Sequence, residues 1–308
     1  MNEFDLINKY LKKLVKFNSS ALKLNDDVFF DKKKKLIVSV DTYNEKIHFP
    51  NFSKPYFVIK KILRSSISDL ISKGVNPKYY FISVSGNHHN LNEINLKKIT
   101  EALRAEQRKF NIKLSGGDTV NSRNLSFTIT TIGFSDKIIK RNNARLNDDI
   151  YVTGNLGDSF LGLKIMQKKY KVSKNKKNYF INKYYCPDLD NNFSNYLHKF
   201  ANTSMDISDG LVADMIKLIS DQKLSFELNL DNVPISSSLS SFLKNFRIKK
   251  DKFITNGDDY KILFTASKSK RKYIQSLSKK MNQKVTIIGK INNNKKNKIL
   301  FENKVKNL

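Results

Sequence analysis

The chain has 308 residues, of which 39% are hydrophobic and 28% are charged, so it can bury a sizeable core, and its length predicts two domains. No run of about 18 uncharged apolar residues is present, and the N-terminus lacks the apolar region of a secretory signal, so we expect neither a membrane span nor export. The single cysteine, Cys186, excludes an internal disulfide and a cysteine-based zinc site, and it suits a reducing, cytoplasmic compartment.

The formal net charge is +29, but only about 8 of the 57 basic residues are arginine. Proteins that recognise nucleic acid rely on arginine for bidentate contacts, and the lysines here are largely dispersed. We therefore interpret most lysines as solvated surface residues and expect no specific nucleic-acid partner. Because so high a charge attracts polyanions at low salt, a basic nucleic-acid-binding protein stays open as an alternative.

The first half of the chain alternates between helical and extended patterns. Residues 4–17 carry one apolar stripe, which predicts a helix, and the stripe consists of Phe4, Ile7, Leu11 and Leu14. Further patterns predict helices from about Ser53 to Gly74 and over 92–110, and strands at 36–40, 79–85 and 125–134.

A basic, Asn-rich stretch at 136–147 precedes a new predicted strand at 150–153, and we place a domain boundary there. In the second half we expect helices over 154–168, up to about 203, from Gly210 and over 268–281, with strands near 225–230, 260–265 and 284–289. We expect the Lys/Asn-rich tail from about residue 292 to be weakly ordered. The alternation in each half predicts an α/β or α+β architecture.

Acidic residues recur in short loops at the predicted ends of strands and helices. The segments are Asn25-Asp26-Asp27, Ser39-Val40-Asp41-Thr42, Ser68-Asp69, Gly116-Gly117-Asp118-Thr119, Asp206-Ile207-Ser208-Asp209-Gly210 and Gly257-Asp258-Asp259-Tyr260. Any one alone is typical of a turn or a helix cap. Together they indicate metal-bridged phosphate chemistry, because clustered carboxylates repel a phosphate but bind Mg²⁺, which prefers hard oxygen ligands. The chain contains neither a P-loop nor the protein-kinase motifs, which excludes those two classes.

In this order and spacing, the segments SVDT, SDLxxxG, GGDT, VTGxxGDSxxGL, MDISDGL and GDDY resemble those of the thiamine-monophosphate kinase family. This family belongs to the aminoimidazole ribonucleotide synthetase-like superfamily, and the resemblance runs from about residue 3 to about residue 291. It implies a two-domain α/β (α+β) fold, with an N-terminal mixed-sheet domain (1–140) that binds ATP and Mg²⁺ and dimerises, and a C-terminal α/β domain (141–308).

The resemblance also implies an activity and its partners. The expected reaction is the ATP-dependent phosphorylation of thiamine monophosphate to thiamine diphosphate by a homodimer that uses several Mg²⁺ ions and has no membrane partner. The attacking phosphate oxygen is already largely anionic at pH 7, because phosphate monoesters have a second pKa of about 6. We therefore expect no catalytic base and no covalent nucleophile, and direct in-line transfer that relies on charge neutralisation.

Individual roles follow from the same resemblance. The implied Mg²⁺ ligands are Asp27, Ser39, Asp41, Asp69, Asp118, Asp206 and Asp209. The implied ATP contacts are Gly117, Asp118, Arg141 and Ser208, and the implied substrate contacts are His48 and Asp258.

The chain departs from the family pattern at several positions. Asn25 stands where the family has Gly, and we expect it to keep a left-handed turn. Val40 replaces a common Thr, and Asp258 stands where Glu is common. The C-terminal aromatic residue that packs on the substrate has no clear counterpart except Phe301. We interpret Asp214, one turn into the helix from Gly210, as a solvent-facing or capping residue.

Two alternatives within the superfamily stay open: another ATP-using enzyme, and a degenerate, inactive member. Relatives that depend on a reactive cysteine, near the N-terminus or at the C-terminus, do not match, because Cys186 occupies neither place.

Overall fold

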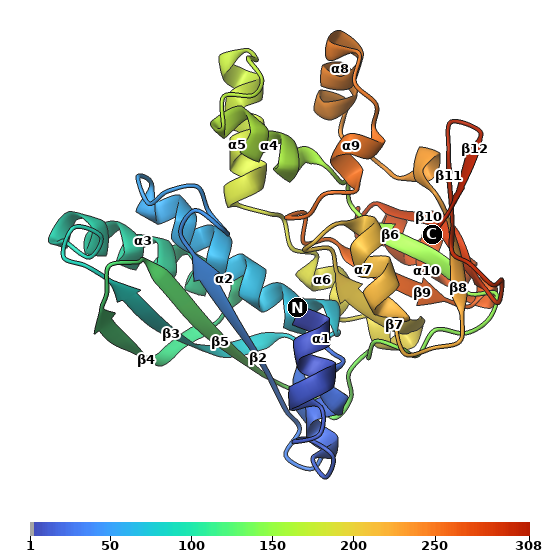
Figure 1. Ribbon diagram of the computed structural model, residues 1–308, viewed down its shortest axis with the longest axis horizontal. Coiled ribbons are helices and arrows are strands. Elements are labelled where there is room, and N and C mark those ends of the chain that lie inside the picture. Colours follow the sequence, from blue (N-terminus) through green and yellow to red (C-terminus); the bar gives the residue numbers. More distant parts are fainter. Residues whose placement is uncertain (1–2) are drawn as a thin grey trace. The chain divides into compact units, whose positions relative to one another are not determined.

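The computed structural model describes residues 3–308, and it describes side chains from Asp5 onward. The chain divides into two compact units, and each contains one β-sheet (Figure 1). The first unit comprises the chain up to Ile71 together with Val75–Ile138, and the second comprises Ser72–Gly74 together with Ile139–Leu308. Both sheets are mixed, which confirms the expected α/β class. Among residues 3–308, no helix combines the length and the apolar character needed to span a membrane.

The first unit is built on a five-stranded sheet of order β1-β2-β5-β3-β4. In that order the strands are Phe29–Asp31, Leu36–Asn44, Ser126–Phe134, Pro77–Gly86 and Lys113–Asn121. Neighbouring strands are antiparallel except β3 and β4, which run parallel. Helices α2 (Pro55–Ser72) and α3 (Glu93–Phe110) lie against one face of this sheet in Figure 1. The unit also contains α1 (Glu3–Leu6) and short helical turns at Ile7–Leu11 and Ser19–Leu24.

Helix α2 packs on the sheet through the apolar stripe that its sequence predicts. The buried members of the stripe are Val58, Ile59, Ile62, Leu63, Ile67, Leu70 and Ile71. Leu70 clusters with Ile37 of β2, and the Thr131 hydroxyl of β5 donates to the Ser66 carbonyl at 3.4 Å. The inward positions of β5 are buried while the outward positions are not, so α2 and the sheet together form the core of this unit.

A buried ion pair joins α2 to α3. The Arg64 guanidinium donates to both carboxylate oxygens of Glu106, at 2.7 and 2.9 Å, and the side chains are only 4% and 1% exposed. The Lys60 ammonium lies 3.4 Å from the same carboxylate. The pair therefore satisfies a charge that would otherwise be buried without compensation.

The second unit is built on a seven-stranded sheet of order β12-β11-β8-β10-β6-β9-β7. In that order the strands are Lys304–Asn307, Lys298–Phe301, Ser225–Asn229, Val285–Asn292, Asp149–Thr153, Ile262–Ala266 and Ala201–Asp206. Its helices are α4 (Asp158–Met166), α5 (Lys174–Tyr185), α6 (Asn191–Ser194), α7 (Leu211–Leu218), α8 (Ser237–Phe246), α9 (Asp251–Ile254) and α10 (Arg271–Lys280), with short helical turns at Leu197–Lys199, Leu230–Asn232 and Lys268–Lys270.

Two apolar clusters hold the second unit together. In the larger one, buried residues of the sheet, among them Ile150, Val152 and Leu263, pack with Leu211 and Met215 of α7. The smaller one joins α4, α5, α8 and α9 through a group that includes Leu161, Phe180, Phe242 and Phe253. The sheet and the helical group therefore have separate cores, and the loops between them carry the polar residues considered below.

Two sequence expectations about the elements were wrong, and several elements were not expected. The expected helix over 4–17 ends at Leu11, because Leu11 and Leu14 are 38% and 79% exposed and a short helix without a packed face is marginal. Of the other two expected stripe residues, Ile7 is half-buried, and the side chain of Phe4 lies outside the described residues. The tail forms the β11–β12 hairpin instead of staying weakly ordered, because β11 pairs with β8. Strands β1, β4 and β7 and helices α8 and α9 were not expected from the sequence.

We predict that Glu106→Ala lowers the free energy of unfolding by about 3–5 kcal/mol, because it leaves the buried Arg64 charge uncompensated. Chemical denaturation of the purified protein measures this change. Glu93→Ala is the matched control, since it removes an exposed helical pair with Lys97, which contributes less than about 0.5 kcal/mol. Equal stability losses in the two variants would contradict the prediction.

Candidate functional site

The first unit brings three of the expected metal ligands together between β2 and α2. Strand alternation puts Ser39, Asp41 and Tyr43 on the face of β2 that meets α2. Ser66 and Asp69 lie one turn apart on the helix and meet them there. The Ser39 hydroxyl donates to the Asp69 carboxylate, and the Tyr43 hydroxyl donates to Asp41 at 3.3 Å and bonds the Ser66 hydroxyl at 3.0 Å. This set is called the β2–α2 cluster below.

The pKa of Tyr43 is shifted by burial and by the charges of this cluster. Burial raises the pKa of its phenol well above the ordinary value, and the negative charges of Asp41 and Asp69 raise it further. Both carboxylates therefore act on one hydroxyl, which stays protonated and able to donate at neutral pH. Tyr43 was not expected from the sequence, although it lies two residues after Asp41 on the same strand and so on the same face.

The β2–α2 cluster fits Mg²⁺ in the type of its donors. Ser39, Asp41 and Asp69 offer only hydroxyl and carboxylate oxygens, which are the ligands that Mg²⁺ prefers. Within residues 3–308, however, no group of three or more His, Cys, Asp or Glu side chains is arranged to hold a metal ion. A bound Mg²⁺ would therefore depend on waters and substrate phosphates for the rest of its shell, which is its usual behaviour.

The other expected ligand before β2 lies in the loop that precedes β1. Asp27 is half-buried there, and its backbone N–H donates to the Asp26 carboxylate at 2.9 Å. The expectation for Asn25 was wrong, because its φ of −124° is not left-handed. The left-handed turn falls earlier instead, at Leu22, Lys23 and Leu24, with φ of 50°, 60° and 54°.

Asp118 and Gly117 lie on β4, away from the β2–α2 cluster. Asp118 is exposed. In the register of the sheet it pairs with Ser83 of β3, Ser83 pairs with Thr128 of β5, and Thr128 pairs with Thr42 of β2. Paired residues share a face, so Asp118 lies with Thr42 on the face opposite to Asp41. Since β4 is three strand spacings of about 4.8 Å from β2, one ion cannot bridge Asp118 and Asp41 of the same chain.

His48 lies beside the β2–α2 cluster. It is exposed in the loop after β2, and its Nδ1 accepts a hydrogen bond from the Asn44 backbone N–H at 2.9 Å. Its ring meets the Tyr43 ring edge to face, with centroids 5.7 Å apart. Tyr43 therefore contacts both His48, the expected substrate contact, and Asp41, an expected metal ligand.

In the second unit, Asp214 organises the loop that follows β7. Asp206 ends β7 and is buried, and the next residues turn into α7. The backbone N–H groups of Ser208, Asp209 and Gly210 all donate to one oxygen of Asp214, at 3.0 Å each. Asp214 is fully buried, so the capping interpretation is confirmed and the solvent-facing one is wrong. Since Asp209 itself is 62% exposed and ion-paired with Lys217, it is fixed by its backbone and by that lysine.

A second loop, Gly257–Tyr260, lies directly against the first. The N–H of Asp258 donates to the Ser208 carbonyl and that of Tyr260 to the Ile207 carbonyl, both at 2.8 Å. A Cβ on Gly257 would come within 1.8 Å of the Ser208 oxygen, so only glycine allows this approach. The expected ATP contact Ser208 and the expected substrate contact Asp258 are therefore neighbours.

The backbone of this second loop is strained. Asp258 and Tyr260 both have left-handed backbones, with φ of 69° and 50°, and the Tyr260 hydroxyl donates to Asp258 at 3.0 Å. A left-handed backbone at residues other than glycine costs about 1–3 kcal/mol each and is concentrated at functional sites.

Two other expected residues lie in other segments of the second unit. Arg141 is half-buried in the segment that leads into β6. Phe301, the candidate for the C-terminal aromatic, packs against the apolar core of the second sheet. It is thus an element of the core.

Comparisons with known proteins place these features in a family. The family model described as "AIR synthase related protein, N-terminal domain" matches residues 24–135. The chain is 33% identical to the thiamine-monophosphate kinase of Buchnera aphidicola subsp. Acyrthosiphon pisum, over 99% of this chain and 95% of that protein. It is 31% identical to the thiamine-monophosphate kinase of Haemophilus influenzae, over 95% and 90% respectively.

The fold is also similar to that of solved structures. The structure of AaThiL complexed with AMPPCP and TMP aligns with a TM-score of 0.85 and 24% identity, covering 100% of this chain and 98% of that chain. This likeness confirms the expected two-domain architecture.

We predict that Asp214→Ala lowers the free energy of unfolding by about 2–4 kcal/mol, because it leaves three backbone N–H groups without their common acceptor. Thermal and chemical denaturation measure the loss. Asp214→Asn keeps one acceptor oxygen and should lose less, and Asp221→Asn, at an exposed position, should lose nothing measurable. A loss below about 1 kcal/mol in Asp214→Ala would show that the loop does not depend on this carboxylate.

Proposed function

The chain belongs to the thiamine-monophosphate kinase family, and from this we propose that it transfers the terminal phosphoryl group of ATP to thiamine monophosphate, giving thiamine diphosphate. The observation that carries the proposal is identity of 33% over 99% of this chain and 95% of a named family member. The β2–α2 cluster supports it independently, because an oxygen-only set of donors suits the metal-assisted chemistry of phosphates.

Charge neutralisation is the main task of the proposed site, since two anionic phosphates must approach each other. We assign Mg²⁺ binding to Ser39, Asp41 and Asp69 in the β2–α2 cluster and to Asp27, Asp118, Asp206 and Asp209 elsewhere. When bound, Mg²⁺ would offset the negative charge of the phosphates. The first unit would hold ATP and the metal ions, consistent with the expected role of residues 1–140.

The protein's own groups would mainly position the two substrates. Asp214 holds the N–H groups of Ser208 and Asp209 in a fixed loop, so that Ser208 is preorganised for a phosphate contact. We assign Gly117, Asp118 and Arg141 to ATP, and His48 and Asp258 to thiamine monophosphate. The attacking phosphate oxygen needs no base, so transfer would be direct and in line without a phosphoenzyme.

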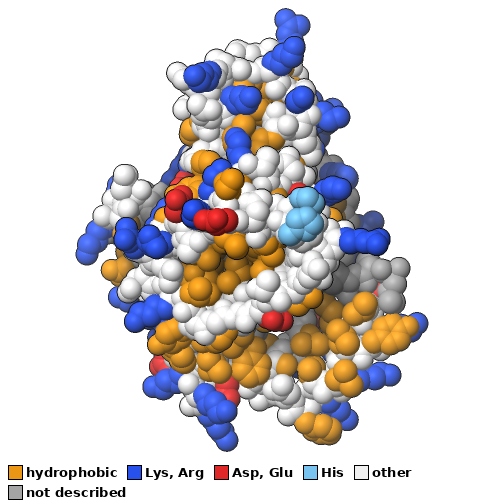
Figure 2. Space-filling model, turned by 90° about the vertical axis from the view of Figure 1, so that its left-hand side faces the viewer, with side chains coloured by type: hydrophobic (Ala, Val, Ile, Leu, Met, Phe, Trp, Pro, Cys, Tyr) orange, Lys and Arg blue, Asp and Glu red, His pale blue; other side chains and the backbone are white. Residues whose placement is uncertain are grey.

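We also propose that the working form is a homodimer that covers the open face of the five-stranded sheet. This face carries exposed apolar residues on four strands: Val40 (61%), Tyr79 (41%), Phe81 (36%), Val120 (52%) and Phe134 (52%). Figure 2 shows hydrophobic side chains gathered over the lower part of the face that it draws. Strand β4 is exposed along its whole length at the sheet edge, and an exposed apolar sheet face of this kind is typical of an association surface.

We predict that Asp69→Asn lowers the rate of thiamine diphosphate formation about 10²–10³-fold, because it removes one of the two charges that would hold Mg²⁺ in the cluster. The assay combines purified protein with ATP, Mg²⁺ and thiamine monophosphate. Asp136→Asn, exposed and in the same unit, serves as the control and should keep full activity.

Full activity in Asp69→Asn would refute the assignment of this cluster. If the unaltered protein forms no thiamine diphosphate but binds ATP, the substrate would be that of another ATP-using member of the superfamily.

We predict that Phe134→Lys converts the dimer into monomers without unfolding the first unit, because it places a charge on the face that would be covered. Sedimentation velocity measures the mass in solution. Ile94→Lys, at a 67% exposed position of α3, is the control and should leave the mass unchanged. A monomeric unaltered protein would contradict the proposed dimer.

A further inference from the structure

Helices α4, α5, α8 and α9 form a strongly basic part of the second unit. They share one apolar cluster, and in Figure 1 they project from the same side of the unit. Residues 158–185 and 237–254, called the helical lobe below, contain thirteen Lys or Arg and only two Asp or Glu, a net charge of +11. Less than a sixth of the chain therefore carries more than a third of its net charge of +29, which an even spread of lysine does not produce.

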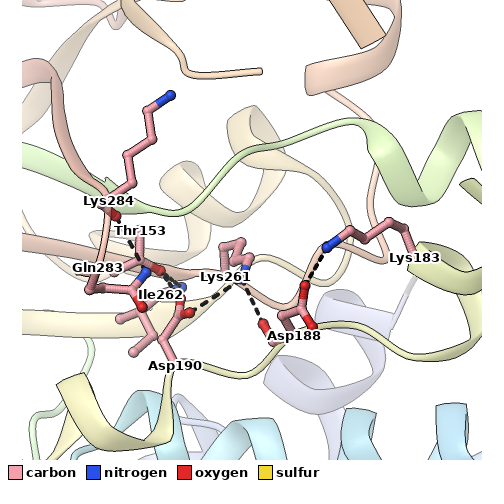
Figure 3. A network of polar contacts seen from close by, with 8 residues as sticks. All are labelled: Thr153, Lys183, Asp188, Asp190, Lys261, Ile262, Gln283 and Lys284. Atoms are coloured by element: carbon pink, nitrogen blue, oxygen red, sulfur yellow. Dashed lines mark hydrogen bonds and ion pairs between the residues drawn. The ribbon is translucent and has the colours of Figure 1, made fainter. Parts of the chain in front are cut away.

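Ion pairs account for only two cations of the helical lobe. Lys183 pairs with the carboxylate of Asp188 (Figure 3), and Lys249 pairs with Glu302. Within residues 3–308, the other exposed cations of the lobe form no ion pair, and they are Lys168, Lys169, Lys171, Lys174, Lys177, Lys244, Arg247 and Lys252. Most of this charge is thus open to a partner from outside the chain.

Helix stability does not explain the lysines at the start of α5. Lys174, Lys176 and Lys177 lie in the first turn of this helix, and no acidic residue accompanies them there. The N-terminal end of a helix is the positive end of its dipole, so cations at this place weaken the helix. An anionic partner would offset that cost.

The basic segments of the helical lobe meet around two aromatic rings. Tyr170, between α4 and α5, contacts the Phe246 ring of α8 with centroids 5.7 Å apart, and Lys176 of α5 donates to Ser241 of α8 at 3.0 Å. Among the described residues of the lobe, Phe246 is the only large apolar side chain that is exposed (42%). The two rings and the cations that flank them in the chain are called the basic–aromatic patch below, and they are Lys169, Tyr170, Lys171, Lys244, Phe246 and Arg247.

We infer that the basic–aromatic patch binds single-stranded nucleic acid without sequence preference, with its cations facing successive phosphates and Phe246 stacking on a base. A basic surface that follows the backbone, combined with an exposed aromatic ring, is the combination by which proteins bind single strands non-specifically. Lysine is a point charge without bidentate base recognition, which agrees with the expected absence of a specific nucleic-acid partner. A membrane surface would need a broader apolar face than Phe246 alone provides.

The test measures the affinity of the purified protein for a fluorescein-labelled oligouridylate of about 16 nucleotides, by fluorescence anisotropy over a range of salt concentrations. The quadruple variant replaces by glutamine the four cations of the patch, Lys169, Lys171, Lys244 and Arg247. We expect it to bind at least about tenfold more weakly, and its plot of log affinity against log salt to be less steep by about 3, since each phosphate contact on a single strand contributes about 0.7 to this slope.

A second variant separates stacking from charge. Phe246→Leu keeps an apolar contact for Tyr170 but removes the ring, so binding should weaken about tenfold while the salt slope stays unchanged. Phe246→Tyr keeps a ring and should bind as the unaltered protein does.

The matched control removes the same charge from other parts of the chain. It replaces by glutamine four exposed lysines of separate segments, Lys98, Lys223, Lys272 and Lys304. This control should change the affinity less than about twofold, because its lysines do not flank the patch. Melting temperatures should agree among the unaltered protein, the quadruple variant and this control, since the replaced side chains form no ion pair within residues 3–308.

Equal losses in the quadruple variant and its control would assign the binding to the charge of the whole chain and overturn the inference. Full affinity in Phe246→Leu would overturn it too, as would displacement of the oligonucleotide by ATP, which would place the nucleic acid in the nucleotide site. Binding to phosphatidylserine vesicles without binding to the oligonucleotide would show that the partner is a membrane surface. None of these measurements uses thiamine diphosphate formation, so the proposed function is tested separately.

Discussion

The contact between two loops of the second unit fixes most of its candidate functional residues. Ser208 can lie against Gly257 only because glycine has no Cβ, and the contact is completed by hydrogen bonds from Asp258 and Tyr260 to the facing carbonyls. Asp214 of α7 accepts hydrogen bonds from the backbone N–H groups of Ser208, Asp209 and Gly210, and so fixes the loop that precedes its own helix. Since three backbone N–H groups converge on one buried carboxylate, the loop is held by the protein before any ligand arrives.

Burial divides the acids of this chain into groups with different tasks. Asp214 and Asp259 are buried, and burial raises the pKa of each, so they act through hydrogen bonds to backbone N–H groups. Asp41 and Asp69 are half-buried, and each accepts a hydrogen bond from a hydroxyl of the β2–α2 cluster. Although the net charge is +29, acidic residues are concentrated in a few segments of the chain, and the proposed phosphate chemistry is assigned to these segments.

The five-stranded sheet separates two groups of expected ligands by its two faces. Its helix-covered face holds Ser39 and Asp41, while Asp118 lies on the open face together with the apolar residues proposed for dimerisation. Alternation along a strand makes this separation unavoidable, because neighbouring residues point in opposite directions. Several metal positions are therefore more consistent with this arrangement than a single one, as the family resemblance implies.

The sequence by itself determined the family, the α/β class and the acidic segments, because apolar periodicity and short motifs are local properties of the chain. It also predicted the stripe of α2 correctly, since a period of 3.6 residues is visible without any partner. Only the tertiary structure decided that Tyr43 joins Asp41 to Ser66, that Asp214 caps its own loop, and that the tail pairs with β8. These outcomes depend on strand pairing and on the burial of single polar atoms, and neither is encoded in a local pattern of residues.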